Sequence, residues 1–153
     1  METAALFHNV RSSYNVGSLF RTADGAGVSK IYLSGYTPTP VDRFGRALQA
    51  ISKTALGAER HIPWEYERNA DRILQKARDE GYAIVGVEQD GRSIEYRKFK
   101  PKDKTLFVFG NEVRGLSPAL REKCDTLIEI PMHGSKESLN VSVAAGIILF
   151  HFQ

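Results

Sequence analysis

Apolar runs of strand length recur along this chain, and they constrain its fold more than any other feature of the sequence. They are AALFHNV, KIYLSG, YAIVGVE, TLFVFG and TLIEIPM, at residues 4–10, 30–35, 82–88, 105–110 and 126–132. Most of them are continuous and do not alternate with polar residues, which is typical of strands covered on both faces of a parallel sheet. Segments with a helical pattern separate them. The sequence therefore predicts an α/β fold with a mainly parallel sheet and flanking helices.

Two of the helical patterns have recognisable ends. The first lies in ERNADRILQKARDEG, residues 67–81, where Asn69 can cap the helix and Gly81 suits a left-handed stop. The second lies in NVGSLFRTADGAG, where Asn15 is the expected start and one of the two glycines at the end of the segment is the expected stop.

Length and composition predict one soluble globular domain over residues 1–153. Apolar residues make up 42% of the chain and charged residues 25%, which is ordinary for such a domain. The only cysteine, Cys124, excludes an intrachain disulfide and offers no metal cluster, so it is either a small core residue or an incidental surface thiol. We expect no metal.

Nothing in the sequence predicts a membrane protein. The longest apolar run, residues 141–152, is far shorter than the roughly 20 residues that a membrane span needs. The N-terminus lacks a basic region before an apolar segment, as a secretory signal would have. We therefore expect a cytoplasmic protein.

The net charge of +3 is weak evidence for a nucleic-acid partner, but the distribution of charge says more. Basic residues crowd into RSIEYRKFKPKDK, residues 92–104, with Tyr96 and Phe99 between them. Such a run is either a solvated loop or an RNA-facing one, and the sequence leaves both open.

The loops that follow the predicted strands are where a ligand is expected, because ligands of open α/β sheets bind at the carboxyl ends of the strands. Three of these loops are unusual: NVRSSYNVGSLFRTADGAGV at residues 9–28, FGNEVRGLSPAL at 109–120 and IPMHGSKESLNVS at 130–142. The chain has no GxxxxGK[ST] signature, and the glycines of GAGVSK precede a strand. A Walker site or a dinucleotide-binding fold is therefore disfavoured.

Taken together, NVGSLFRTADGAGV, LFVFGNEVRGLS and IEIPMHGSKESLNVSVAAGIIL resemble the three motifs of the SpoU (TrmH-like) family of the SPOUT superfamily, in the family's order. The family consists of RNA ribose methyltransferases that use S-adenosylmethionine. The resemblance implies a parallel sheet whose C-terminal segment threads a loop to form a trefoil knot, and a homodimer. Many relatives carry an extra RNA-binding domain, and the resemblance implies none in residues 1–153.

The resemblance also implies a cofactor site in the second and third motif loops. There Gly110 would allow close backbone approach, and Ile130, Met132 and Leu139 would form an apolar bed for adenine. The cofactor-binding residues implied in this way are Phe109, Gly110, Asn111, Ile130, Met132, Ser138 and Leu139.

The catalytic residues implied are Arg21, Asn15, Glu112, Ser138 and Asn140. Ser138 is either a helix cap or a functional group, and Asn140 needs a polar partner if it is buried. Glu112 is expected to organise nearby polar groups more than to act as a general base. Asn15 can cap its helix and also help to position Arg21.

Arg21 has two possible roles. One proposal for the family makes the matching arginine the base that removes the ribose hydroxyl proton. This is expensive, because an arginine pKa above about 12 makes the neutral form cost roughly 7 kcal/mol at pH 7. We favour a cationic Arg21 that clamps the adjoining phosphate and aligns the hydroxyl, with late proton loss to Glu112 or water.

Three further basic residues are candidates for contact with RNA phosphates. Arg11 matches a basic position often seen in the family, Arg114 lies where the family varies, and Lys53 lies in KTALGAE, which resembles the family segment between the second strand and its next helix.

The resemblance thus implies S-adenosylmethionine-dependent methyl transfer to a ribose 2′-hydroxyl of tRNA or rRNA. The alternative is a noncatalytic RNA-binding module that retains the fold.

Overall fold

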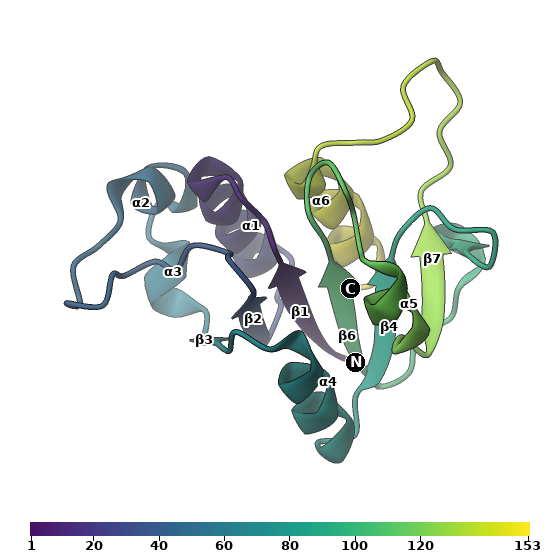
Figure 1. The fold of residues 1–153 in the computed structure, drawn as a ribbon, viewed down its shortest axis with the longest axis horizontal. Coiled ribbons are helices and arrows are strands. Elements are labelled where there is room, and N and C mark those ends of the chain that lie inside the picture. The colour runs from purple at the N-terminus through teal and green to yellow at the C-terminus, as the bar shows by residue number, and fades with distance from the viewer.

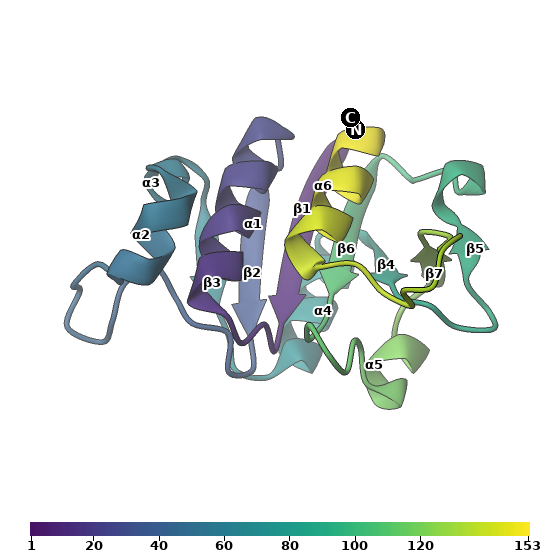
Figure 2. The same cartoon turned by 90° about the horizontal axis from the view of Figure 1, so that it is seen from above.

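A parallel sheet of seven strands forms the centre of the computed structural model, which describes all residues from 1 to 153 (Figure 1). The strands lie in the order β3-β2-β1-β6-β4-β7-β5. Their bounds are β1 (Glu2–His8), β2 (Lys30–Ser34), β3 (Trp64–Tyr66), β4 (Ala83–Val87), β5 (Ile94–Glu95), β6 (Lys104–Phe109) and β7 (Thr126–Glu129). All neighbouring pairs are parallel. The carboxyl ends of the strands therefore lie together along one edge of the sheet, which we call the carboxyl edge (Figure 2).

The α/β class and the parallel sheet predicted from the sequence are confirmed. Each of the five apolar runs overlaps one strand. The two strands that were not predicted, β3 and β5, have only three and two residues and lie at the outer edges of the sheet. The trefoil knot stays a prediction.

Helices cover both faces of the sheet. Their bounds are α1 (Ser13–Gly25), α2 (Gln49–Ala55), α3 (Ala58–His61), α4 (Ala70–Asp79), α5 (Pro118–Glu122) and α6 (Val141–His151), with a 3₁₀ turn at Tyr96–Lys98. Helices α1, α2, α3 and α6 pack on one face, whereas α4 and α5 pack on the other (Figures 1 and 2). No helix is long and apolar enough to cross a membrane.

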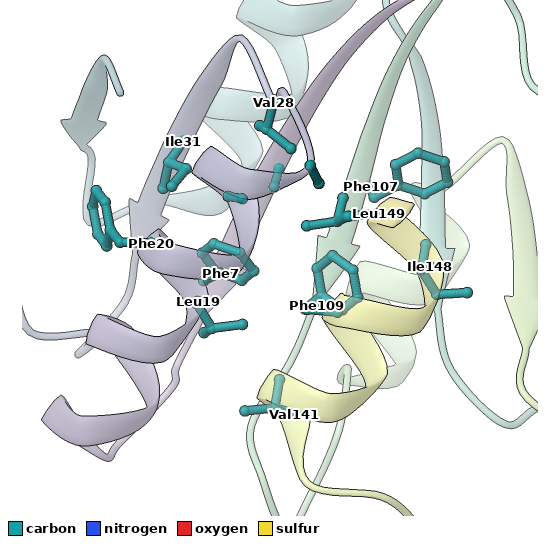
Figure 3. Close-up of a cluster of buried hydrophobic side chains, with 14 of the residues drawn as sticks. Phe7, Leu19, Phe20, Val28, Ile31, Phe107, Phe109, Val141, Ile148 and Leu149 are labelled. Carbon is teal, nitrogen blue, oxygen red and sulfur yellow. The ribbon is translucent and has the colours of Figure 1, made fainter. Parts of the chain in front are cut away.

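The larger of the two core clusters lies between the central strands and the helices α1 and α6 (Figure 3). Phe7 of β1 and Phe109 of β6 meet there with their ring centroids 5.5 Å apart. Phe107 stacks on Phe152 at 5.3 Å, which ties the end of the chain to the middle of the sheet. Because these rings are fully or almost fully buried, they fix α1 and α6 against the sheet.

The second cluster lies under α4 and α5 on the opposite face. Cys124 packs against it, and its thiol donates to the backbone oxygen of Leu120 at 3.4 Å. Burial, with a smaller contribution from Asp125, raises the pKa of the Cys124 thiol to about 11. Of the two alternatives for this cysteine, the structure favours the core residue.

The predicted helix ends are right for α4 and wrong for the start of α1. Asn69 caps α4 by accepting from the Asp71 N–H at 3.0 Å, and Gly81 follows with φ +89°. Helix α1 begins at residue 13, because Ser12 is its N-cap and accepts from the Asn15 N–H at 3.2 Å. Asn15 is therefore in the first turn, and its side chain is free for other partners.

Several side chains of the basic run at residues 92–104 already have partners within the chain. Tyr96 and Phe99 pack against the larger core cluster. Arg92 pairs with Asp90 at 3.1 Å and Arg97 pairs with a neighbouring glutamate. These contacts favour the solvated alternative.

Candidate functional site

The Glu112 carboxylate joins the loop after β6 to the start of α1. The Arg11 backbone N–H donates to both carboxylate oxygens at 3.1 Å, and the Ser12 N–H donates to Oε1 at 3.0 Å. The side-chain amide of Asn15 donates to the same oxygen at 3.2 Å. The free N–H groups and the dipole of a helix N-terminus stabilise a negative charge in this position. Glu112 therefore holds α1 in place relative to the loop.

These contacts also determine the protonation state of Glu112. Partial burial raises the pKa of its carboxyl, but hydrogen bonds from the N–H groups of Arg11, Ser12 and Glu112 itself, and from the Asn15 amide, outweigh it. The net pKa lies below the ordinary value of 4.5. Glu112 is thus ionised at neutral pH and is a weak proton acceptor, which suits the organising role expected for it.

Asn15 and Asn140 connect the N-termini of α1 and α6. The Asn140 amide donates to Asn15 Oδ1 at 3.4 Å. Its Oδ1 accepts from the Ser142 N–H at 2.9 Å and from the Ser142 hydroxyl at 2.6 Å, so Asn140 is the N-cap of α6. The expectation that a buried Asn140 would need a partner does not apply, because its side chain is exposed. Ser138 is not the cap and lies exposed in the preceding loop.

A tight turn at residues 110–116 carries Asn111 and Glu112. Asn111 and Gly115 exchange backbone hydrogen bonds of 3.2 and 2.9 Å, and Gly115 has φ +64°. A Cβ on Gly110 would lie 2.5 Å from the backbone carbonyl of Gly115. Real Cβ atoms do not approach backbone so closely. Glycine is therefore required at 110 by the turn itself, whereas the sequence had suggested close approach of a ligand.

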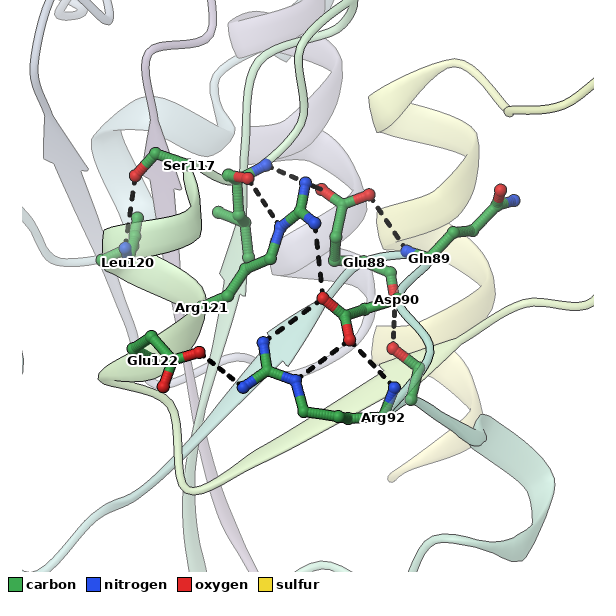
Figure 4. A network of polar contacts seen from close by, with 10 residues as sticks. Glu88, Gln89, Asp90, Arg92, Ser117, Leu120, Arg121 and Glu122 are labelled. Carbon is green, nitrogen blue, oxygen red and sulfur yellow. Dashed lines mark hydrogen bonds and ion pairs between the residues drawn. The ribbon is translucent and has the colours of Figure 1, made fainter.

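Glu88, at the end of β4, holds the far side of this turn (Figure 4). One carboxylate oxygen accepts from the Leu116 N–H at 2.7 Å, and the other accepts from the Gln89 N–H at 3.0 Å. The Arg121 guanidinium donates to the Leu116 carbonyl at 2.8 Å and pairs with Asp90 at 3.3 Å. The turn is thus fastened to α1 through Glu112 and to β4 through Glu88.

Two adjoining hollows lie between the ends of β4, β6 and β7 and the start of α6. Their volumes are about 130 and about 160 Å³, and the residues common to both walls are Val87, Glu88, Ser138, Leu139 and Ala144. Every residue assigned to the cofactor from the sequence lines at least one of them, namely Phe109, Gly110, Asn111, Ile130, Met132, Ser138 and Leu139. Each hollow alone is below the roughly 300 Å³ of a small-molecule site, so a ligand of that size would occupy both. We call them the paired hollows.

A third hollow, of about 830 Å³, opens on the other side of the 110–116 turn. Arg11 and Arg114, both predicted to contact RNA, line it together with Asn15 and Glu112. Tyr36, which follows β2, also lines it. We call this space the arginine hollow.

Arg21 lies apart from this arrangement within a single chain. It follows Asn15 by six residues on α1, which places it about 9 Å along the helix and about 240° around it. It is exposed in a separate hollow of about 620 Å³, which we call the Arg21 hollow, together with Phe150 of α6 and Lys53. Lys53 lies on α2, and not in the expected connection before it. The structure therefore brings Arg11 and Arg114 together but not Arg21 and Glu112.

Glu88 and Tyr36 are among the residues of the site that sequence reasoning missed. Glu88 ends a predicted strand, so the rule that ligands bind at the carboxyl ends of strands could have found it. Tyr36 is a single aromatic residue after a strand, and no pattern in the sequence marks it.

Comparison with known proteins gives matches over nearly the whole chain. The model of the SpoU rRNA Methylase family matches residues 2–150. The chain is similar to the 23S rRNA (guanosine-2′-O-)-methyltransferase RlmB of Neisseria meningitidis, with 35% identity over 144 residues, or 94% of this chain and 55% of that protein.

Two solved structures have the same fold over most of the chain. One is the AdoMet-bound rRNA methyltransferase from Sinorhizobium meliloti, with 32% identity, a TM-score of 0.85, and coverage of 97% of this chain and 54% of the other. The second is the A. aeolicus TrmH/SpoU tRNA modifying enzyme, with 31% identity, a TM-score of 0.80, and coverage of 97% and 72%. The chain spans little more than half the length of the curated relatives it matches.

Proposed function

The chain belongs to the SpoU rRNA methylase family, and from this premise we propose that it transfers a methyl group from S-adenosylmethionine to a ribose 2′-hydroxyl of tRNA or rRNA. The observation that carries the proposal is the junction of Glu112, Asn15 and Asn140. This junction lies where the 110–116 turn separates the paired hollows from the arginine hollow. A methyl donor on one side and a nucleotide on the other would meet there.

The residues of the paired hollows fit S-adenosylmethionine. Ile130, Met132 and Leu139 offer apolar surface for an adenine ring, and Glu88 and Glu129 place carboxylates on the walls. The cofactor carries a sulfonium and an ammonium group, so negative walls suit it. Two solved relatives, the Sinorhizobium meliloti enzyme and the methyltransferase AviRb from Streptomyces viridochromogenes, are described as bound to AdoMet. When bound, this cofactor supplies a methyl group activated by its sulfonium.

The chain's own residues then position the acceptor. Glu112 stays ionised and fixes the N-terminus of α1, so that Asn15 faces the junction in one orientation. Asn140 holds Asn15 from the side of α6. Because every contact to Glu112 favours its charged form, the hydroxyl proton is lost late and to water more readily than to this carboxylate.

We propose that Arg21 acts across a homodimer. Its separation from Asn15 along and around α1 and its place in a separate hollow support a role in the site of a second copy, and the Arg21 hollow also exposes apolar surface. Leu56 is 65% exposed and Phe150 53% exposed beside it. A second copy would cover these side chains and bring a cationic guanidinium to the phosphate of the acceptor nucleotide.

We further propose a single catalytic domain over residues 1–153, a C-terminal knot and a cytoplasmic location.

Methyl transfer from tritiated S-adenosylmethionine tests the proposal, with total RNA from a strain that lacks the gene as the acceptor. Nuclease digestion then locates the label, which we expect on ribose. Label on a base would contradict the 2′-hydroxyl assignment. Calorimetric binding of S-adenosylmethionine without transfer to any RNA would favour the noncatalytic module instead.

A further inference from the structure

Tyr36 is a large aromatic side chain that the core does not use. It is 58% exposed at the carboxyl edge, two residues after the end of β2, and it lines the arginine hollow opposite the 110–116 turn. An exposed aromatic group beside two arginines has the composition of a surface that binds unpaired nucleotides.

Hydrogen bonds hold Tyr36 at its backbone N–H and at its side-chain hydroxyl. The Tyr36 N–H donates to the Asn9 side-chain oxygen at 3.1 Å, and the hydroxyl oxygen accepts from the Asn111 amide at 3.0 Å. Asn9 itself has φ +56°, a left-handed conformation that asparagine tolerates better than most residues other than glycine. The backbone that carries Tyr36 is therefore held in one conformation although its ring faces solvent.

The neighbours of Tyr36 are held as firmly. The Gly35 N–H donates to the Arg68 carbonyl at 3.0 Å, and its carbonyl accepts from the Tyr66 hydroxyl at 2.5 Å. The buried hydroxyl of Thr37 donates to the backbone oxygen of Phe7 at 3.0 Å. Such a segment loses little conformational entropy when a ligand packs on it, which favours binding.

We propose that Tyr36 stacks on the nucleobase of the nucleotide that is methylated. The phosphates of that nucleotide would lie toward Arg11 and Arg114. This inference rests on the proposed function. The 110–116 turn lines both the arginine hollow and one of the paired hollows, so a base on Tyr36 places the attached ribose next to Asn15 and Glu112. The Tyr36 hydroxyl is already bonded to Asn111. The contact is therefore made by the ring, and a ring stacks on any base.

A double-mutant cycle between protein and RNA tests this proposal. The probes are two fluorescein-labelled RNA pentamers of the same length: one has abasic riboses with a single central adenine, and the other is abasic throughout. Fluorescence anisotropy measures the affinity of the full chain for each. We expect Tyr36→Leu to weaken binding of the adenine probe about tenfold or more and to change binding of the abasic probe by less than twofold.

Two further variants make the result specific. Tyr36→Phe keeps the ring and should bind the adenine probe within about threefold of the wild type, because Asn111 keeps its second bond to the Asn9 carbonyl at 3.0 Å. Phe44→Leu removes another exposed aromatic ring, which lies in none of the hollows described above, and should leave both affinities unchanged. Equal losses on the two probes for Tyr36→Leu, or an equal loss for Phe44→Leu, would overturn the proposal.

The outcome is separable from that of the proposed function. A chain that binds the adenine probe through Tyr36 but transfers no methyl group would refute the methyltransferase activity, and Tyr36 would remain a base-stacking residue whose nucleotide is bound and not methylated. Normal methyl transfer by Tyr36→Leu, with unchanged kcat/KM on total RNA, would refute the role of Tyr36 and leave the methyltransferase activity standing.

Discussion

Glu112 accepts hydrogen bonds from four residues, namely Arg11, Ser12, Asn15 and Asn111, and glutamine cannot replace it without turning one of its acceptor oxygens into a donor. We expect Glu112→Gln to lower the free energy of unfolding by about 1 kcal/mol, as loss of an anion at a helix N-terminus does. Methyl transfer should fall while S-adenosylmethionine affinity stays within a few fold. Thermal denaturation and calorimetry measure these effects, and Glu122→Gln, at an exposed carboxylate on α5, is the control.

The same variant has a defined pH dependence. The folded pKa of Glu112 lies below its ordinary value of 4.5, so its contribution to stability is present above that pH and is lost as the pH falls through the folded pKa. The difference in unfolding free energy between wild type and Glu112→Gln should therefore be constant near neutrality and shrink below about pH 4.5. A difference that grows on acidification would contradict the contacts described here.

Arg21 is predicted to act in catalysis and not in cofactor binding. Arg21→Ala should keep S-adenosylmethionine affinity within a few fold while methyl transfer falls about 100-fold or more, a loss of about 2.7 kcal/mol. Arg21→Lys keeps the charge and loses the planar fork, so poor rescue would implicate bidentate positioning. Good rescue with a pH optimum at lower values would favour the base mechanism. Undiminished transfer by Arg21→Ala would remove Arg21 from the site.

The 110–116 turn is the element on which both kinds of hollow depend, and Gly110 is its most constrained position. We expect Gly110→Ala to lower stability and S-adenosylmethionine affinity together, because the new methyl group would meet backbone that cannot move without opening the turn. Gly91→Ala is the matched control, since a Cβ there meets nothing within 4 Å. A stable Gly110→Ala protein with normal affinity would show that the turn is more adaptable than its contacts indicate.

Elements with long apolar runs or clear caps could be predicted from the sequence, because their signals are local. Strand β6 and helix α4 are examples. Strand β5 could not, because two residues at the edge of a sheet form no pattern, and its pairing with β7 depends on tertiary structure. The start of α1 was misplaced because Ser12 and Asn15 are both good caps. In the structure Ser12 is the cap, and the Asn15 side chain donates to the Glu112 carboxylate, 97 residues later, a partner that no local pattern reveals.

The site residues, too, could be predicted where their signal is local and not where it depends on tertiary structure. Those in the two motif loops were predicted and do line common hollows, since carboxyl ends of parallel strands converge. The separation of Arg21 from Glu112 could not be predicted without the helix boundaries.

At the scale of the whole molecule, the proposed dimer makes a quantitative prediction. Light scattering should give about twice the 17.1 kDa mass of the chain. Mixing Arg21→Ala with Glu112→Gln under conditions of subunit exchange should restore activity, because about half of the dimers pair the two variants and each of these contains one intact site. The mixture should reach about a quarter of wild-type activity. A mixture no more active than its components would mean that each site uses one chain only.

The direction of α6 has a practical consequence. It starts at the carboxyl edge beside Asn15 and runs back along the sheet, so Gln153 finishes near Met1 at the opposite edge (Figure 2). A biosensor surface, an affinity tag or a fluorescent fusion attached through either end would leave the loops of the carboxyl edge, where we propose that the nucleotide binds, oriented toward solution. A short peptide could also join the two ends into a covalent ring, and new ends could then be opened in an exposed loop. The resulting proteins would carry the motifs in a different order along the chain while their arrangement in space is kept.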